Sequence, residues 1–229
     1  MATRPFESFR SIGDFFIRDL KPELRPLGDG PVCPVDGTLR ACTDLTPGGE
    51  VIQVKGKSYT VEQLLGDADI ARRCEQGQLW NFYLSPQDAH HIYSPVDGEI
   101  IETIHIPGKL WPVNDWALRS INGLFVVNER VVTIIHSAAG IVAVVMVGAT
   151  NVGRIKLSYT DLVTNRAPWR RKSQERRLHN PPIATARGAK IGTFMMGSSV
   201  LLVSEFPLAP NPNCRDLKKV RYGTSLARI

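Results

Sequence analysis

Between residues 79 and 206, short apolar segments alternate with turn residues along most of the chain. Six of these segments are rich in β-branched and aromatic residues, which favour strands, and are punctuated by Gly, Pro, Asn and Asp. Their close spacing favours a sandwich or barrel of strands over a parallel sheet with crossover helices. The six expected strands are “QLWNFYLS”, “EIIETIHI”, “LFVVNERVVTIIH”, “GIVAVVMVGA”, “GRIKLSYT” and “SSVLLVSEF”.

Two earlier segments show helical periodicity. Residues 5–20, “PFESFRSIGDFFIRDL”, predict a short amphipathic helix that either packs on the core or lies on a membrane surface. Residues 60–77 predict a helix or helix pair, with Thr60 as the N-cap and Gln63 three residues later. We therefore expect one mainly β domain over residues 1–229, with a few helices, in the α+β class.

A weak internal sequence repeat adds detail to this expectation. The segments “PVDGTLRAC” (34–42) and “PVDGEIIET” (95–103) share a tight turn that leads into a strand. The second segment, with “IHIPGKLWPVND”, is similar to the strand–turn pattern of lipoyl and biotinyl domains, but the modifiable lysine hairpin is absent. This similarity predicts hammerhead-like strand–turn elements within the β core.

The basic residues of the chain, which carries a net charge of +6, are concentrated in one segment. Residues 166–190 contain eight basic residues, one acid (Glu175) and Trp169. A solvated loop and a patch for anionic lipid are both compatible with this composition, and tryptophan suits a lipid headgroup region. No recognition-helix, RRM or zinc-finger pattern indicates nucleic acid. The eight basic residues are Arg166, Arg170, Arg171, Lys172, Arg176, Arg177, Arg187 and Lys190.

Targeting and cysteine patterns suggest the compartment. No apolar run of eighteen residues is present, and the N-terminal stretch lacks the apolar core of a signal peptide. The four cysteines form no CxxC pair, which argues against a structural metal and favours reduced thiols. We expect a protein of the cytoplasm or of the cytoplasmic face of the cell membrane.

Candidate catalytic residues lie in two segments. In “YLSPQDAHHIYSP”, Asp88 and His90 share one face of an extended backbone, where they could form an acid–base pair, whereas His91 points to the other face. In “VNERVVTIIH”, a branched strand ends in His136. Ordinary surface histidines remain the alternative for both segments.

A Gly-Ser pair stands at the start of the last apolar strand. The order Gly197-Ser198-Ser199-Val200-Leu201 does not fit the G-x-S-x-G elbow of α/β-hydrolases. A neighbouring base could instead activate the serine oxygen to attack the carbonyl of the preceding glycine. The resulting ester can eliminate and leave a ketone-bearing N-terminus, a pyruvoyl group.

These segments together resemble the phosphatidylserine decarboxylases of the bacterial and mitochondrial class. The matching segments occur in the family's order from Ser8 to Phe206, and the family's usual Leu-Gly-Ser-Thr is Met196-Gly197-Ser198-Ser199 here. The segments are “SFRSIGDFFIRDLKPELRPL”, “CPVDGTL”, “VIQVKGKSYTVEQLL”, “YLSPQDAHHIYSPVDGEI”, “PGKLWPVN”, “NERVV”, “VGATNVGRI” and “FMMGSSVLLVSEF”.

The resemblance assigns roles to single residues. It implies cleavage between Gly197 and Ser198, a long chain of residues 1–197, a short chain of 198–229, and a pyruvoyl group derived from Ser198. It implies that Asp88 orients the histidine that deprotonates Ser198, for which we select His136. His90 is then the candidate proton donor in turnover.

The resemblance also implies the substrate and its surroundings. Phosphatidylserine would form a Schiff base with the pyruvoyl group and would be converted to phosphatidylethanolamine and carbon dioxide on an anionic membrane surface. No metal is implied, and a homodimer stays open. The alternatives are a pyruvoyl decarboxylase for another serine lipid or an amino acid, and an inactive lipid-binding homologue.

Overall fold

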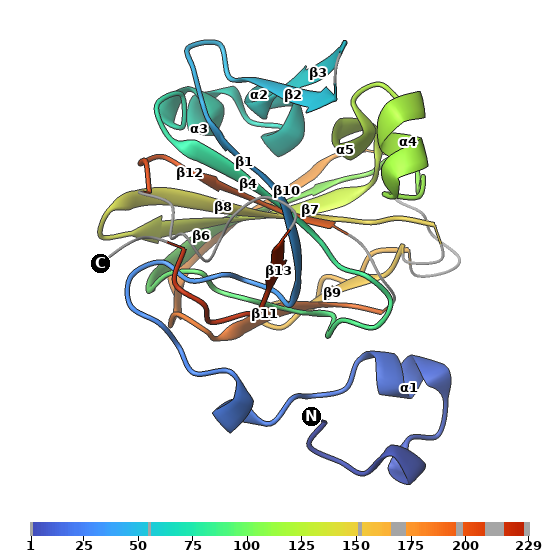
Figure 1. Ribbon diagram of the computed structural model, residues 1–229. Helices are drawn as coiled ribbons and strands as arrows, with labels where there is room; N and C mark the ends of the chain where they lie inside the picture. The colour runs from blue at the N-terminus through green and yellow to red at the C-terminus, as the bar shows by residue number, and fades with distance from the viewer. Residues whose placement is uncertain are drawn as a thin grey trace.

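The computed structural model describes residues 2–54, 56–150, 153–165, 173–195, 199–208 and 218–226 (Figure 1). Its largest element is an antiparallel eight-stranded sheet with the order β10-β6-β7-β8-β12-β4-β1-β13. The late strand β12 lies near the middle of this sheet, between β8 and β4. In sheet order, the strands are Glu175–Thr185, Gly98–Ile106, Arg130–Ser137, Gly140–Val147, Ser199–Ser204, Gln78–Tyr83, Gly37–Asp44 and Lys218–Val220.

Further elements lie on the two sides of the large sheet. Figure 1 shows a hairpin, β2–β3, and the short helices α2, α3, α4 and α5 above the sheet, with β9 and β11 of a three-stranded sheet below it. The three-stranded sheet has the order β5-β11-β9, with bounds His91–Tyr93, Lys190–Phe194 and Ile155–Leu157. The other elements are β2 (Glu50–Val54), β3 (Lys57–Thr60), α2 (Val61–Leu65), α3 (Ala68–Arg73), α4 (Asp115–Ser120) and α5 (Leu124–Val127).

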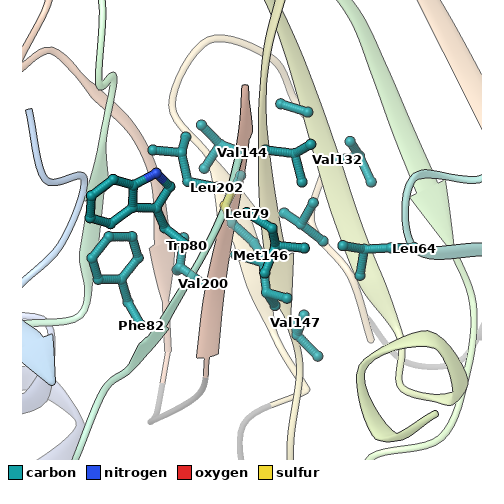
Figure 2. Close-up of a cluster of buried hydrophobic side chains, with 14 of the residues drawn as sticks. Leu64, Leu79, Trp80, Phe82, Val132, Val144, Met146, Val147, Val200 and Leu202 are labelled. Atoms are coloured by element: carbon teal, nitrogen blue, oxygen red, sulfur yellow. The ribbon is translucent and has the colours of Figure 1, made fainter. Parts of the chain in front are cut away.

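The large sheet buries apolar side chains on both faces. Val200 lies opposite Phe82 and Leu202 lies opposite Trp80, so these four side chains share one face. Figure 2 shows Trp80 and Phe82 on one side of the central strands and Leu64 of α2 on the other. All five residues are almost completely buried. The sheet therefore forms the centre of a layered core.

The three-stranded sheet packs closely on the face that carries Trp80. A Cβ at Gly192 of β11 would lie 2.8 Å from Sδ of Met146, which lies opposite Val200. The missing side chain at Gly192 therefore permits the two sheets to approach.

The expected fold class is confirmed: the chain is mainly β, with short helices and large antiparallel sheets. Within the described residues the large sheet ends at β10 and β13, so the layered sandwich describes it better than a closed barrel. Both PVDG turns lead into strands, β1 and β6. Residues 60–77 contain the helix pair α2 and α3, and the Thr60 hydroxyl accepts from Gln63 N–H at 3.1 Å.

Three expectations differ from the structure. The helix expected over 5–20 is reduced to a 3₁₀ turn, η1 (Phe6–Ser8), and α1 (Ile12–Phe16), before a second turn, η2 (Pro22–Leu24). The segment expected to be one strand before His136 begins with α5. The basic segment contains the long strand β10. No helix in the described ranges is both long and apolar enough to cross a bilayer.

Candidate active site

The loop between β4 and β5 holds both ends of the segment that carries the expected cleavage point. Before that point, the Phe194 N–H donates to the carbonyl oxygen of His90 at 2.9 Å. After it, Ser199 pairs with Tyr83 of β4 on one side and with Val147 of β8 on the other. Met196, Gly197 and Ser198 lie outside the described residues. The flanking contacts nevertheless place residues 83–90 beside both ends of this segment.

His90 is completely buried and is oriented by the backbone. Its Nδ1 lies 2.8 Å from the carbonyl oxygen of Asp88. Because a carbonyl only accepts hydrogen bonds, Nδ1 carries the proton and Nε2 of the neutral ring keeps its lone pair. Nε2 is buried and has no partner among the described residues. The His90 ring therefore presents an unsatisfied base.

The surroundings of His90 keep it neutral. Its ring centroid lies 3.9 Å from that of Phe16 in α1. Burial lowers the pKa of His90 to about 4, and the hydrogen bond to Asp88 offsets only part of that effect. His90 is therefore a free base throughout the neutral pH range.

The carboxylate of Asp88 has partners other than a histidine. Its Oδ2 accepts from the backbone N–H of Ser85 at 2.8 Å and from the Ser85 hydroxyl at 2.6 Å. Both carboxylate oxygens lie 3.1 Å from Nζ of Lys219 in β13. Asp88 and His90 are thus neighbours as expected, but the backbone carbonyl of Asp88, not its carboxylate, orients the imidazole.

The structure does not bring His136 to this site. His136 is exposed and pairs with Ile141 at the start of β8, whereas Ser199 pairs with Val147 at the end of β8. Six residues of extended strand separate the two positions by about 20 Å. The expectation that Asp88 orients His136 as the cleavage base is therefore wrong. The register of β7 and β8 puts His136 at the opposite end of the sheet from Ser199.

The remaining histidines are engaged elsewhere. Nδ1 of His91 lies 3.0 Å from the Thr193 hydroxyl, and Nε2 lies 3.2 Å from a carboxylate oxygen of Asp19. His105 is buried against Glu129, with 2.8 Å between Nε2 and Oε1. His179 contacts Thr103. Of the five histidines in the chain, His90 combines a backbone contact with Phe194 and a ring nitrogen that has no partner among the described residues.

Ser199 is the described residue next to the cleavage point. It is 1% exposed, and its Oγ has no hydrogen-bond partner among the described residues. Ser199 shares a sheet face with Tyr83 and Val147, which lie opposite it on the neighbouring strands. Unpaired polar atoms thus lie on both sides of the cleavage segment, at His90 and Ser199.

Sequence reasoning missed a buried ion pair close to Asp88. Arg25 donates to both carboxylate oxygens of Asp36, at 2.9 and 2.5 Å, and both residues are buried. The backbone N–H of Tyr222 also donates to Asp36, and the Tyr222 ring stacks on Tyr93 at 3.8 Å. The sequence predicted only a tight turn for the first PVDG segment, which contains Asp36.

The “NERVV” segment has a structural role in this arrangement. The Asn128 side chain bonds the backbone of Trp111 and Gly148. Arg130 donates to four backbone carbonyls around the ends of α2 and α5. These contacts tie the helical layer to the sheet and to the loop after β8.

Several cations of the basic segment, residues 166–190, form ion pairs with acidic residues. Arg176 donates to Glu102 at 2.6 Å, and Arg177 donates to Asp161 at 2.6 Å. Lys190 pairs with an acid on the N-terminal segment. Acids elsewhere in the chain thus pair with these three residues, which lie in strands β10 and β11 and not in a solvated loop. Arg166, Trp169, Arg170, Arg171 and Lys172 lie outside the described residues.

Comparison with known proteins assigns the class. The family model described as phosphatidylserine decarboxylase matches residues 12–228. The chain belongs to this family, whose members are lyases made as self-processing proenzymes.

Individual members of the family are similar in sequence to this protein over most of the chain. The phosphatidylserine decarboxylase proenzyme of Anaeromyxobacter sp. (strain K) is 40% identical over 86% of this chain and 70% of its own. The proenzyme of Myxococcus xanthus is 39% identical over 89% of this chain and 72% of its own. That of Variovorax paradoxus is 38% identical over 96% of this chain and 78% of its own.

Proposed function

We propose that this chain cleaves itself between Gly197 and Ser198 and then converts phosphatidylserine to phosphatidylethanolamine and carbon dioxide. Family membership supports the reaction. Two backbone contacts support the position of the site. Phe194 bonds to His90 before the proposed cleavage point, and Ser199 pairs with Tyr83 after it, so both ends of this segment lie beside the loop with the buried base.

His90 is the proposed base for self-cleavage. Its Nε2 takes the hydroxyl proton of Ser198, and the serine oxygen attacks the carbonyl carbon of Gly197. The amide C–N bond breaks, and the proton passes to the freed nitrogen. Loss of the Ser198 Cα proton then breaks the Cβ–O bond and releases Gly197 as a carboxylate. The remaining enamine takes up water and releases ammonia, which leaves the pyruvoyl group.

The surroundings fit such a group. Nε2 of His90 and Oγ of Ser199, both buried and without a partner among the described residues, belong to residues beside the two ends of the segment in which it would form. The pyruvoyl group supplies a ketone that accepts the electron pair left when carbon dioxide departs. No dissociable cofactor is part of the proposal.

His90 is also the proposed proton carrier in turnover. Burial disfavours the imidazolium, so a proton placed on Nε2 is held weakly and passes readily to a basic carbon. The Asp88 carbonyl keeps the ring in the tautomer that leaves Nε2 available. One residue can therefore serve in both reactions, and His136 is not required in either.

The two chains would remain associated after cleavage. The short chain, residues 198–229, would carry β12, which pairs with β4 and β8, and β13, which pairs with β1. Separation would break the centre of the large sheet and the ion pair between Lys219 and Asp88.

The N-terminal segment is the proposed membrane contact. Phe6 and Ile12 are 69% and 83% exposed, and Phe15 packs edge-on against Phe6 and Phe9. Exposed aromatic and aliphatic side chains of this kind partition into the headgroup region of a bilayer. We place the protein peripherally on the anionic cytoplasmic face of the cell membrane, with the basic residues between 166 and 172 as further contacts.

Carbon dioxide release tests the reaction. The purified protein is supplied with carboxyl-labelled phosphatidylserine in mixed micelles, or with free labelled serine. The proposal predicts release from the lipid and none above background from serine. Preferential release from serine would assign the chain to amino-acid decarboxylation, and no release from either by a cleaved protein would indicate an inactive lipid-binding homologue.

A further inference from the structure

A large pocket lies between the N-terminal segment and the body of the protein, next to the Asp88 loop. Its volume is about 1010 Å³, and its walls include Gln87, Asp88 and Ala89, the three residues before His90. Figure 1 shows the N-terminal segment with α1 at one end of the molecule, below the layer that contains β11. The pocket therefore lies beside the loop that carries His90.

The charge of the pocket wall is strongly positive. Among the described residues, six cationic side chains and two carboxylates line it. Both carboxylates are already neutralised: Asp36 by Arg25, and Asp88 by Lys219. Arg4 is paired with an acid on its own segment. Among the described residues, the other three cations have no carboxylate partner, and these are Arg18, Lys21 and Arg221.

Arg18 is the best positioned of the three. Its two terminal nitrogens donate to backbone carbonyls, at 3.2 Å to Phe15 and 2.7 Å to Gln87. The guanidinium is thus fixed between the N-terminal segment and the Asp88 loop, with neutral partners only. Burial lowers the pKa of Arg18, and the carboxylates of Asp36 and Asp88 compensate only in part. A partly buried, uncompensated cation stabilises an anion that enters the pocket.

We propose that this pocket binds the phosphodiester of the lipid headgroup through Arg18, Lys21 and Arg221. This inference rests on the proposed function. In phosphatidylserine the phosphate and the amine are separated by two carbons, so a phosphate site must adjoin the reacting group. The pocket is suited to that position because Ala89, the residue before His90, forms part of its wall.

The charge balance also favours turnover. The substrate headgroup carries a phosphate, a carboxylate and an ammonium group, whereas the product has lost the carboxylate. A positive pocket therefore holds the substrate more strongly than the product. Release of phosphatidylethanolamine follows from the loss of one negative charge at this site.

A soluble short-chain substrate separates headgroup binding from membrane binding. Dihexanoyl phosphatidylserine is used as a monomer, and KM and kcat are measured for the parent, the double variant Lys21→Gln/Arg221→Gln, and Arg18→Gln. Lys21 and Arg221 are exposed, so the double variant should fold. Arg119→Gln, at an exposed cation on α4, is the matched control.

We expect each exposed cation to contribute up to about fivefold in KM, with kcat and self-cleavage unchanged. Arg18→Gln should raise KM further, and the control should match the parent. Unchanged KM in both pocket variants, or an equal rise in Arg119→Gln, would overturn the proposal.

A binding measurement tests the pocket without catalysis. Glycerophosphoethanolamine and inorganic phosphate are titrated calorimetrically into the parent and the double variant. The proposal predicts that the parent binds both compounds and that the double variant binds each of them more weakly. No binding by the parent, or equal binding by parent and variant, would overturn the proposal. Because this readout needs no turnover, it stands even if the decarboxylase assay is negative.

Discussion

The backbone N–H of Phe194 donates to the carbonyl oxygen of His90 at 2.9 Å, four residues before the serine at the expected cleavage point. This contact joins the end of β11 to the loop that holds Asp88, while Ser199 joins the start of β12 to Tyr83, at the start of the same loop. The segment with the expected cleavage point therefore begins and ends against one short stretch of chain, and the histidine of that stretch has a ring nitrogen without a partner in the part of the chain that the structure describes.

The first prediction separates the two candidate bases. His90→Ala should remain a single chain or cleave much more slowly, because it removes the base beside the cleavage segment. A general base contributes about 10²–10⁴-fold to a rate. His136→Ala is the matched control and should cleave at the parental rate, since the β7–β8 register holds His136 at the far end of the sheet. A denaturing gel over time measures both, and blocked cleavage in His136→Ala alone would reverse the assignment.

A second prediction concerns pH. Because burial lowers the pKa of His90 to about 4, the ring stays unprotonated in mildly acidic buffer. Self-cleavage at about pH 5.5 should therefore proceed nearly as fast as at neutral pH, whereas a base with an ordinary histidine pKa would be mostly protonated. A rate that falls steeply below neutral pH, with its midpoint near 6.5, would exclude His90 as the base.

The same pKa sets the sign of an effect on stability. The folded-state pKa of His90 lies below the unfolded value, so the unfolded chain binds more protons between about pH 6.5 and pH 4. The free energy of unfolding should thus fall as pH is lowered through this window, by up to about 3 kcal/mol from this residue. Urea titrations of the parent and His90→Gln at several pH values should show a weaker pH dependence in the variant.

The third prediction concerns the ion pair of Asp88 and Lys219, which would link the two chains that the proposed cleavage produces. Asp88→Asn should lower the free energy of unfolding by about 1.5–3 kcal/mol, because it weakens charge-assisted bonds to Ser85 and Lys219. Self-cleavage should be slowed much less than in His90→Ala, since the carbonyl that orients His90 is retained. A double-mutant cycle with Lys219→Met measures the coupling, and loss of cleavage equal to that of His90→Ala would restore a catalytic role for the carboxylate.

A fourth prediction concerns membrane binding. Replacement of Arg170, Arg171 and Lys172 by Gln should weaken binding to anionic liposomes, most clearly at low salt, where exposed charges are least screened. Self-cleavage should be unchanged, and Arg119→Gln should bind like the parent. Liposome sedimentation provides the measurement. Equal binding of the parent to neutral and anionic liposomes would count against this role.

Local sequence signals predicted much of the fold correctly. The capping box of Thr60 and Gln63 and the apolar run from Val200 to Val203 carry their structural information within a few residues. Where tertiary contacts decide, the same reasoning failed. Leu124–Val127 consists of strand-favouring types apart from its leucine, yet it is helical because it packs over the sheet and its end is bonded by Arg130.

The candidate site shows the same division. The motif around Ser198 and the nearness of Asp88 and His90 can be read from the chain. The position of His136 cannot, because it depends on which residues of β7 and β8 lie opposite one another and on which end of β8 meets Ser199. The neutralisation of Arg176 by Glu102 likewise joins residues far apart in sequence. Strand register and ion pairs between distant residues thus could not be predicted from the sequence.

The most direct test of the account is a denaturing mass spectrum of the parent beside Ser198→Ala and Ser199→Ala. The parent should give two chains divided between Gly197 and Ser198, whose masses sum to that of the precursor plus one water and minus one ammonia. Ser199→Ala should divide in the same way, since its hydroxyl does not attack, and Ser198→Ala should remain a single chain. An undivided 25.4 kDa parent, or two chains in Ser198→Ala, would contradict the central claim that this protein makes its own pyruvoyl group from Ser198.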